Sequence, residues 1–93
     1  MYFRQAIQTK FFGPSNVRGS RVKASCQAKS IILDWNHALN PDENHRNAAE
    51  ELALKMNWEG AWFGGVIPDG TYVFVNINPF QNVTPEPAFD VAA

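Results

Sequence analysis

Residues 40–58, NPDENHRNAAEELALKMNW, carry the strongest structural signal in the chain. Asn40 is a favoured helix N-cap, Pro41 suits the first helical position, and Glu43 stands where it can complete a capping box. Side chains suited to a core recur along the stretch at helical spacing. They are His45, Ala49, Leu52, Ala53 and Met56. The stretch therefore predicts one amphipathic helix, from about Pro41 to Asn57, with this stripe buried.

Five segments around the helix have the apolar alternation of β-strands. They are Ala6 to Phe12, Arg21 to Ala28, Ser30 to Trp35, Ala61 to Ile67, and Thr71 to Ile77. Turn residues separate the first two segments at 13–16, GPSN, and the last two at 68–70, PDG. The sequence therefore predicts an α+β protein: a curved antiparallel sheet of about five strands (β-β-β-α-β-β) with one helix packed across it.

A chain of 93 residues is long enough for one small domain. We expect a single α+β domain over residues 1–78 and an irregular tail over 79–93, where three prolines disfavour regular structure. The single cysteine, Cys26, excludes an internal disulfide framework and suits a reducing compartment. The chain has neither an apolar run of ~18 residues nor the features of a secretion signal. These features predict a cytoplasmic protein without a membrane partner.

The strands and the helix together define a predicted core. Its helix-facing members are Val22, Ala24, Cys26, Leu33, Ala49, Leu52, Met56, Val73 and Val75. Both faces of the last strand are apolar, so Tyr72 and Phe74 on its other face would form an exposed aromatic patch or lie in a central strand. Gly64 and Gly65 indicate a bulge or a close backbone approach within the fourth strand.

The net charge of −1 conceals a strong polarity along the chain. Residues 1–33 contain six basic residues and no acid, whereas residues 34–93 contain nine acids and two basic residues. Such asymmetry indicates a surface that faces a partner. The alternative is that the acidic helix neutralises the basic strands within one molecule.

The basic half is concentrated in residues 11–28, FFGPSNVRGSRVKASCQA, around a predicted turn. We expect this turn and an open sheet face to form a binding surface. Its candidate residues are Arg18, Arg21, Lys23, Gln27, Tyr72 and Phe74. Arginine and aromatic residues anchor protein interfaces, and the same side chains can contact phosphates and stack on bases. Trp58, Trp62 and Phe63 would add a hot spot if two of them proved exposed together.

Other kinds of site have weaker support. Asp34, His37 and His45 lack the spacing of metal ligands, so no metal and no other cofactor is expected. Cys26 alternates with Val22 and Ala24, which favours burial over a role as a nucleophile. The turn at 13–19 lacks the lysine and serine of a phosphate-binding loop. The sequence thus predicts a protein without enzymatic activity.

Three stretches resemble a group of small proteins carried by phages, plasmids and other mobile elements. They are TKFFGPSNVRGSRVKA at 9–24, the predicted helix, and GGVIPDGTYVFV at 64–75. In that group, a T-K-x-x-G-P-[ST]-N-x-R-G-[AS]-R pattern precedes an E-N-H helix and a G-G-x-x-P-D-G hairpin. The group has no assigned activity. The resemblance, which covers roughly residues 9–75, implies an accessory protein of a mobile element, a setting in which small proteins often inhibit host defence.

These observations lead to two expected functions. The first is a non-enzymatic interaction protein that inhibits a host nucleic-acid-processing or defence complex, with a host protein or a protein–nucleic-acid complex as its partner. The alternative is a module that binds single-stranded DNA or RNA directly through the basic turn and the open sheet face. A homodimer is compatible with either function.

Overall fold

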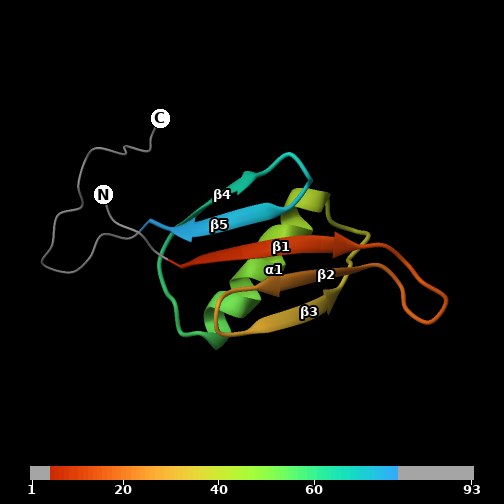
Figure 1. Cartoon of the computed structure of the whole chain (residues 1–93), viewed down its shortest axis with the longest axis horizontal. Coiled ribbons are helices and arrows are strands. Elements are labelled where there is room, and N and C mark those ends of the chain that lie inside the picture. The colour runs from red at the N-terminus through yellow and green to blue at the C-terminus, as the bar shows by residue number, and fades with distance from the viewer. Residues whose placement is uncertain (1–4, 78–93) are drawn as a thin grey trace, which may run out of the picture.

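The computed structural model describes residues 5–77, which form one antiparallel sheet with a helix on one face (Figure 1). The strands are β1 (Ala6–Phe12), β2 (Arg21–Ser25), β3 (Ser30–Asp34), β4 (Trp62–Val66) and β5 (Tyr72–Asn76), and the helix is α1 (Pro41–Lys55). The strand order is β3-β2-β1-β5-β4, and all neighbours are antiparallel. The α+β class and the predicted element order are thereby confirmed. The predicted tail at 79–93 lies outside the described residues.

The helix begins as predicted. The Asn40 side chain accepts a hydrogen bond from the Glu43 amide at 2.8 Å, and the Glu43 carboxylate accepts one from the Asn40 amide at 3.0 Å. The helix ends at Lys55, two residues before the predicted end, because Asn57 adopts a left-handed conformation with φ of 60°. The Trp58 amide then donates to the Ala53 carbonyl at 2.9 Å, which closes the last turn.

β2 is shorter than predicted and ends at Ser25 rather than Ala28. The Cys26 amide donates to the Lys29 carbonyl at 2.9 Å, so Gln27 and Ala28 form a two-residue turn into β3. The other four strands differ from their predicted bounds by at most one residue at each end. The first three strands therefore form the predicted meander.

The core lies between the sheet and the predicted helical stripe. The buried apolar side chains are Ile7, Val22, Ala24, Ala48, Ala49, Leu52, Ala53 and Phe74. Cys26, Leu33 and Met56 are half-buried against this core. On the helix, His45 is buried as well, while Arg46 and Glu50 on the other side are exposed.

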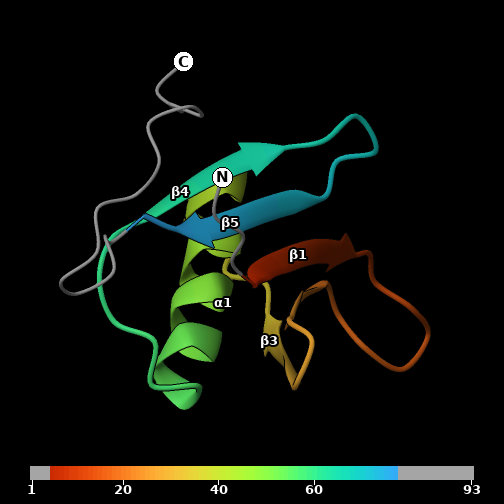
Figure 2. The ribbon, with the colours of Figure 1, turned by 60° about the vertical axis from the view of Figure 1, so that its left-hand side comes forward.

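The prediction that Val73 and Val75 belong to the helix-facing core is wrong. In β5 it is Tyr72 and Phe74 that face the helix, whereas Val75 is 38% exposed on the opposite face. α1 packs mainly against β1, β2 and β3, and Figure 2 shows the helix on one face of the sheet. Only long side chains of β5 can span the distance to the helix, and the two aromatic rings meet that requirement.

Candidate interaction surfaces

The face of the sheet that α1 leaves uncovered carries a basic row. Lys10 of β1 lies directly opposite Lys23 of β2, and Phe12 lies opposite Arg21 in the next pair on the same face. Two like charges in facing positions repel each other and gain from a negatively charged partner. Asp34 of β3 lies opposite Arg21, and Asp69 interacts with Lys10, so the positive charge of the open face that favours a negative partner is concentrated at Lys10 and Lys23.

The open face is also rich in exposed apolar side chains. Those between 38% and 59% exposed are Phe12, Ile32, Phe63, Ile67, Val75 and Ile77. The strand registers place Ile32 beside Lys23 and Phe63 beside Val75. Apolar residues next to basic ones are typical of protein-binding surfaces.

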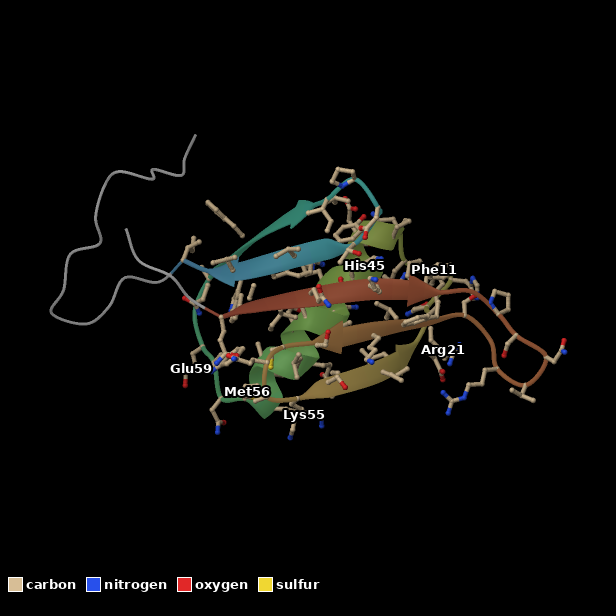
Figure 3. All side chains as sticks on the ribbon, viewed as in Figure 1. Phe11, Arg21, His45, Lys55, Met56 and Glu59 are labelled. Carbon is tan, nitrogen blue, oxygen red and sulfur yellow. The ribbon has the colours of Figure 1, made fainter. Side chains whose placement is uncertain are left out.

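Arg21 is held at one end of the open face. Its guanidinium carbon lies 5.7 Å from the centroid of the Phe12 ring, within the range of a cation–π contact. Its Nε is buried and has no hydrogen-bond partner within the described residues 5–77. Figure 3 shows Arg21 where the loop between β1 and β2 leaves the sheet. Arg21 is therefore partly a packing residue, and its removal would affect stability as well as binding.

The loop that carries Arg18 is closed by Ser15. The Ser15 amide donates to the Arg18 carbonyl at 2.7 Å, and the Ser15 hydroxyl accepts from the Arg18 amide at 3.1 Å and from the Val17 amide at 3.4 Å. Because these two amides already have an acceptor, they do not offer a free anion-binding nest. Arg18 itself is exposed at the end of this short turn.

The structure separates the six predicted binding residues. Arg21 and Lys23 share the open face, and Arg18 lies in the adjoining loop. Gln27 lies in the turn at the other end of β2, because that strand ends before it. Tyr72 and Phe74 are on the helix side of the sheet, and Phe74 is only 8% exposed. The expected aromatic patch on the open face is therefore absent from β5.

A polar network, buried at Thr9 and His45 and exposed at Asp42, connects β1, α1 and β5. Thr9 Oγ1 and His45 Nδ1 share a hydrogen bond of 2.6 Å, and the His45 ring stacks on Tyr72 with centroids 3.9 Å apart. Tyr72 donates its hydroxyl proton to Asp42. Burial lowers the pKa of His45 below its ordinary 6.5, against the opposing effect of the Asp42 charge. The hydrogen bond to Asp42, more than burial, raises the pKa of Tyr72 above its ordinary value.

The Thr9 hydroxyl and the His45 imidazole of this network are not accessible to a substrate. Thr9 is fully buried and His45 is nearly so, and the imidazole lies between Trp35 and Tyr72. A general base must reach the proton that it removes from a substrate, and these rings cover His45. We assign the network to the packing of α1 against the sheet.

On the helix side, a groove of about 1040 Å³ lies between α1 and the β4–β5 hairpin. Its aromatic lining consists of Trp58, Trp62, Tyr72 and Phe74, with Trp58 and Trp62 6.1 Å apart between centroids. Its walls are small residues, among them Ala49 and Ala53 on the helix and Gly64 on β4. α1 packs mainly against β1, β2 and β3, and within residues 5–77 the space between α1 and the β4–β5 hairpin is left open as this groove.

The rim of the groove is acidic. Its charged lining residues are Asp42, Glu43, Glu50, Glu59 and the single cation Arg46. Sequence interpretation identified the aromatic cluster at Trp58 and Trp62 but missed the groove. Three sequence features together could have indicated the groove: the acidic outer face of the helix, the alanines on its flank, and the glycines in β4.

The charge polarity of the chain becomes a separation in space. The basic row lies on the open face, whereas the acids of α1 lie on the other side of the sheet. Among residues 5–77, the acids next to the basic row come from outside α1: Asp34 of β3 lies opposite Arg21, and Asp69 interacts electrostatically with Lys10. The alternative in which the helix neutralises the basic strands through ion pairs is therefore not what the described residues show.

Comparison of the chain with protein-family models, with curated proteins and with solved structures finds no match. The single helix, α1, does not combine the length and apolar character that a bilayer crossing requires, within the described part of the chain. Over the same residues, no three side chains of histidine, cysteine, aspartate or glutamate gather into a metal-binding group.

Proposed function

We propose that this chain is a small non-enzymatic interaction protein whose open sheet face binds a negatively charged surface of another protein. One observation carries the proposal: Lys10 and Lys23 lie opposite each other on an uncovered sheet face, and of these two lysines only Lys10 has a described acidic neighbour, Asp69, with which it interacts electrostatically. A partner carboxylate placed between them would relieve their repulsion. The apolar residues around them would supply buried area.

The composition of the open face favours a protein partner over a nucleic acid. Branched aliphatic side chains such as Ile32, Ile67 and Val75 pack against protein but offer bases no stacking surface. The aromatic residues expected for stacking, Tyr72 and Phe74, are committed to the helix side.

The setting of the proposed function comes from the sequence. The resemblance to proteins of phages and plasmids supports an accessory role in a host cell, and we propose a host nucleic-acid-processing or defence complex as the target. Blocking such a complex needs affinity and a matching surface but no catalytic group.

Direct binding of single-stranded nucleic acid is the second candidate. Phe12 favours this second candidate, because its ring is exposed, makes a cation–π contact with Arg21, and lies on the same face as Lys10. One base could stack on the ring while the basic row contacts phosphates.

The test is capture of partners from host lysate with tagged protein, with and without nuclease, at low and high salt. The test variant is Lys10→Glu with Lys23→Glu, which reverses both lysine charges of the open face. The control variant is Lys55→Glu, which reverses a charge on the helix. We expect a defined host protein that resists nuclease, binds the control and is lost with the double variant.

Direct titration of purified protein with labelled oligothymidylate separates the two candidates. Phosphate contacts make affinity fall steeply with salt, whereas an interface with apolar contacts loses less. Tight, salt-sensitive binding of the oligonucleotide without a nuclease-resistant protein would replace the proposal with the second candidate. Equal capture by wild type and by the double variant would rule out the open face as the binding site.

A further inference from the structure

β4 is an edge strand with unused backbone hydrogen-bonding groups. The Ile67 amide donates to the Thr71 carbonyl at 2.9 Å, and the Ile77 amide donates to the Ala61 carbonyl at 2.9 Å, at the two ends of its ladder with β5. Because an antiparallel ladder alternates, Phe63 and Gly65 also bond to β5. The amide and carbonyl groups of Trp62, Gly64 and Val66 therefore point away from the sheet, with no hydrogen-bond partner among residues 5–77.

This edge lacks the features that usually protect an exposed strand. The sequence of β4, WFGGV, contains neither a charged residue nor proline. Its backbone can therefore accept an added strand, in the manner by which sheet edges bind extended peptides.

The groove lies next to this edge and has a charge of its own. The side chains of Trp62 and Val66 face the helix side of the sheet, where both residues line the groove. A strand added along β4 would direct every second side chain to that same side, toward the acidic rim formed in part by Glu50 and Glu59.

We propose that β4 and the groove together bind an extended segment of a partner protein that carries lysine or arginine at alternate positions. The outward groups of β4 bond to the backbone of the segment. The four carboxylates of the rim outnumber its one cation, Arg46, and attract the basic side chains. Trp58 and Trp62 offer ring faces on which such side chains pack.

The negative charge of the groove favours a basic partner segment as its occupant over other segments of this chain. A second copy pairing through β4 would bring a strand without any cation. Residues 78–93 contain Glu86 and Asp90 and no lysine or arginine. Residues 1–4 add only Arg4, so none of these segments can neutralise the four carboxylates of the rim, whereas a segment with several basic residues can. The groove is separate from the open face, so this inference does not depend on the proposed function.

The probe is an acetylated and amidated peptide, RTRVRT, titrated into the full chain and followed by tryptophan fluorescence and calorimetry. Trp58 and Trp62 should report its binding directly, because they line the groove. We expect saturable binding that weakens with salt, and no comparable binding of ETEVET.

Two pairs of variants test the charge and the edge. Glu50→Lys reverses a charge of the rim and should weaken binding about tenfold or more, while Glu51→Lys, exposed on the same helix outside the groove, should bind as wild type does. Val66→Pro removes one outward amide and should abolish binding, whereas Val66→Thr keeps the amide and should bind. Circular dichroism melting confirms that each variant is folded.

Three results would overturn the proposal. They are equal binding of ETEVET, unchanged binding by Glu50→Lys or Val66→Pro, and the absence of RTRVRT binding to the folded wild type. Sedimentation of wild type and Val66→Pro tests whether a second copy of the chain occupies β4. A dimer that only the wild type forms would assign β4 to self-association instead.

Discussion

Thr9 and His45 meet in the interior, with Thr9 Oγ1 2.6 Å from His45 Nδ1, although 36 positions separate them in the chain. Thr9 comes from the central strand β1 and His45 from the first turns of α1. Their hydrogen bond sets where the helix lies on the sheet, and it lets the His45 ring stack on Tyr72 of β5. One buried polar contact therefore joins three elements.

Thr9→Val should destabilise the fold without changing its shape. The valine fills the same volume but leaves His45 Nδ1 without its partner in a buried site, which costs about 1–3 kcal/mol. Urea unfolding of wild type and variant measures this difference. Lys10→Met, which alters a neighbouring exposed residue, is the control and should change stability by less than about 0.5 kcal/mol.

Stability should fall as the pH is lowered through the ordinary histidine range. The pKa of His45 is lower in the fold than its ordinary 6.5, so the unfolded chain binds this proton at higher pH than the folded chain. The loss begins near the unfolded value and levels off below the folded one. Urea unfolding between neutral pH and about pH 5 measures it.

Variants of both histidines test whether His45 causes this loss of stability at low pH. His45→Gln removes the buried imidazole and should flatten the decline over this pH range. His37→Gln changes an exposed residue and should keep the decline. A decline that persists unchanged in His45→Gln would assign the effect to carboxylates instead.

Adjacent glycines in β4 should differ in their tolerance of alanine. A Cβ at Gly64 would stand 2.8 Å from an edge carbon of the Phe74 ring, whereas a Cβ at Gly65 would meet nothing within 4 Å. Phe74 is buried and cannot move freely, so Gly64→Ala should cost about 1–3 kcal/mol. Gly65→Ala should be nearly neutral in the same thermal melts, and equal losses would contradict this packing.

Two leucines of α1 give the sharpest test of its orientation. Leu52 is completely buried and Leu54 is 69% exposed. Leu52→Asp buries a charge among apolar side chains and should unfold the domain, and Leu52→Ala should cost about 2–5 kcal/mol. Leu54→Asp should leave the far-ultraviolet circular dichroism spectrum and the melting temperature close to those of wild type.

Local chemistry explains why the helix could be predicted from the sequence. Asn40, Pro41 and Glu43 act within one turn, and the structure realises the capping box as the sequence implies. The end of β2 could not be predicted in this way. Gln27 and Ala28 are not typical turn residues, and the pairing of β2 with β3 holds the turn closed.

The orientation of β5 could not be inferred because its sequence, YVFVN, is apolar on both faces. Alternation limits the choice to two sets of residues, and tertiary contacts choose between them. Phe74 covers Gly64, and Tyr72 reaches Asp42. Of the candidate binding site, the basic residues of β2 were recognised, while the groove depends on the lateral offset of the helix, for which no local pattern exists.

The central place of β1 in the sheet has a consequence for biosynthesis. β1 is made first, yet one of its two ladders requires β5, since Ala6 pairs with Val75. During translation, β1, β2, β3 and α1 leave the ribosome as a unit that can already bury Leu52 against Val22. The second edge of β1 then stays open until the last strand emerges, and nascent chains stopped before residue 72 should be prone to pairing with one another along that edge.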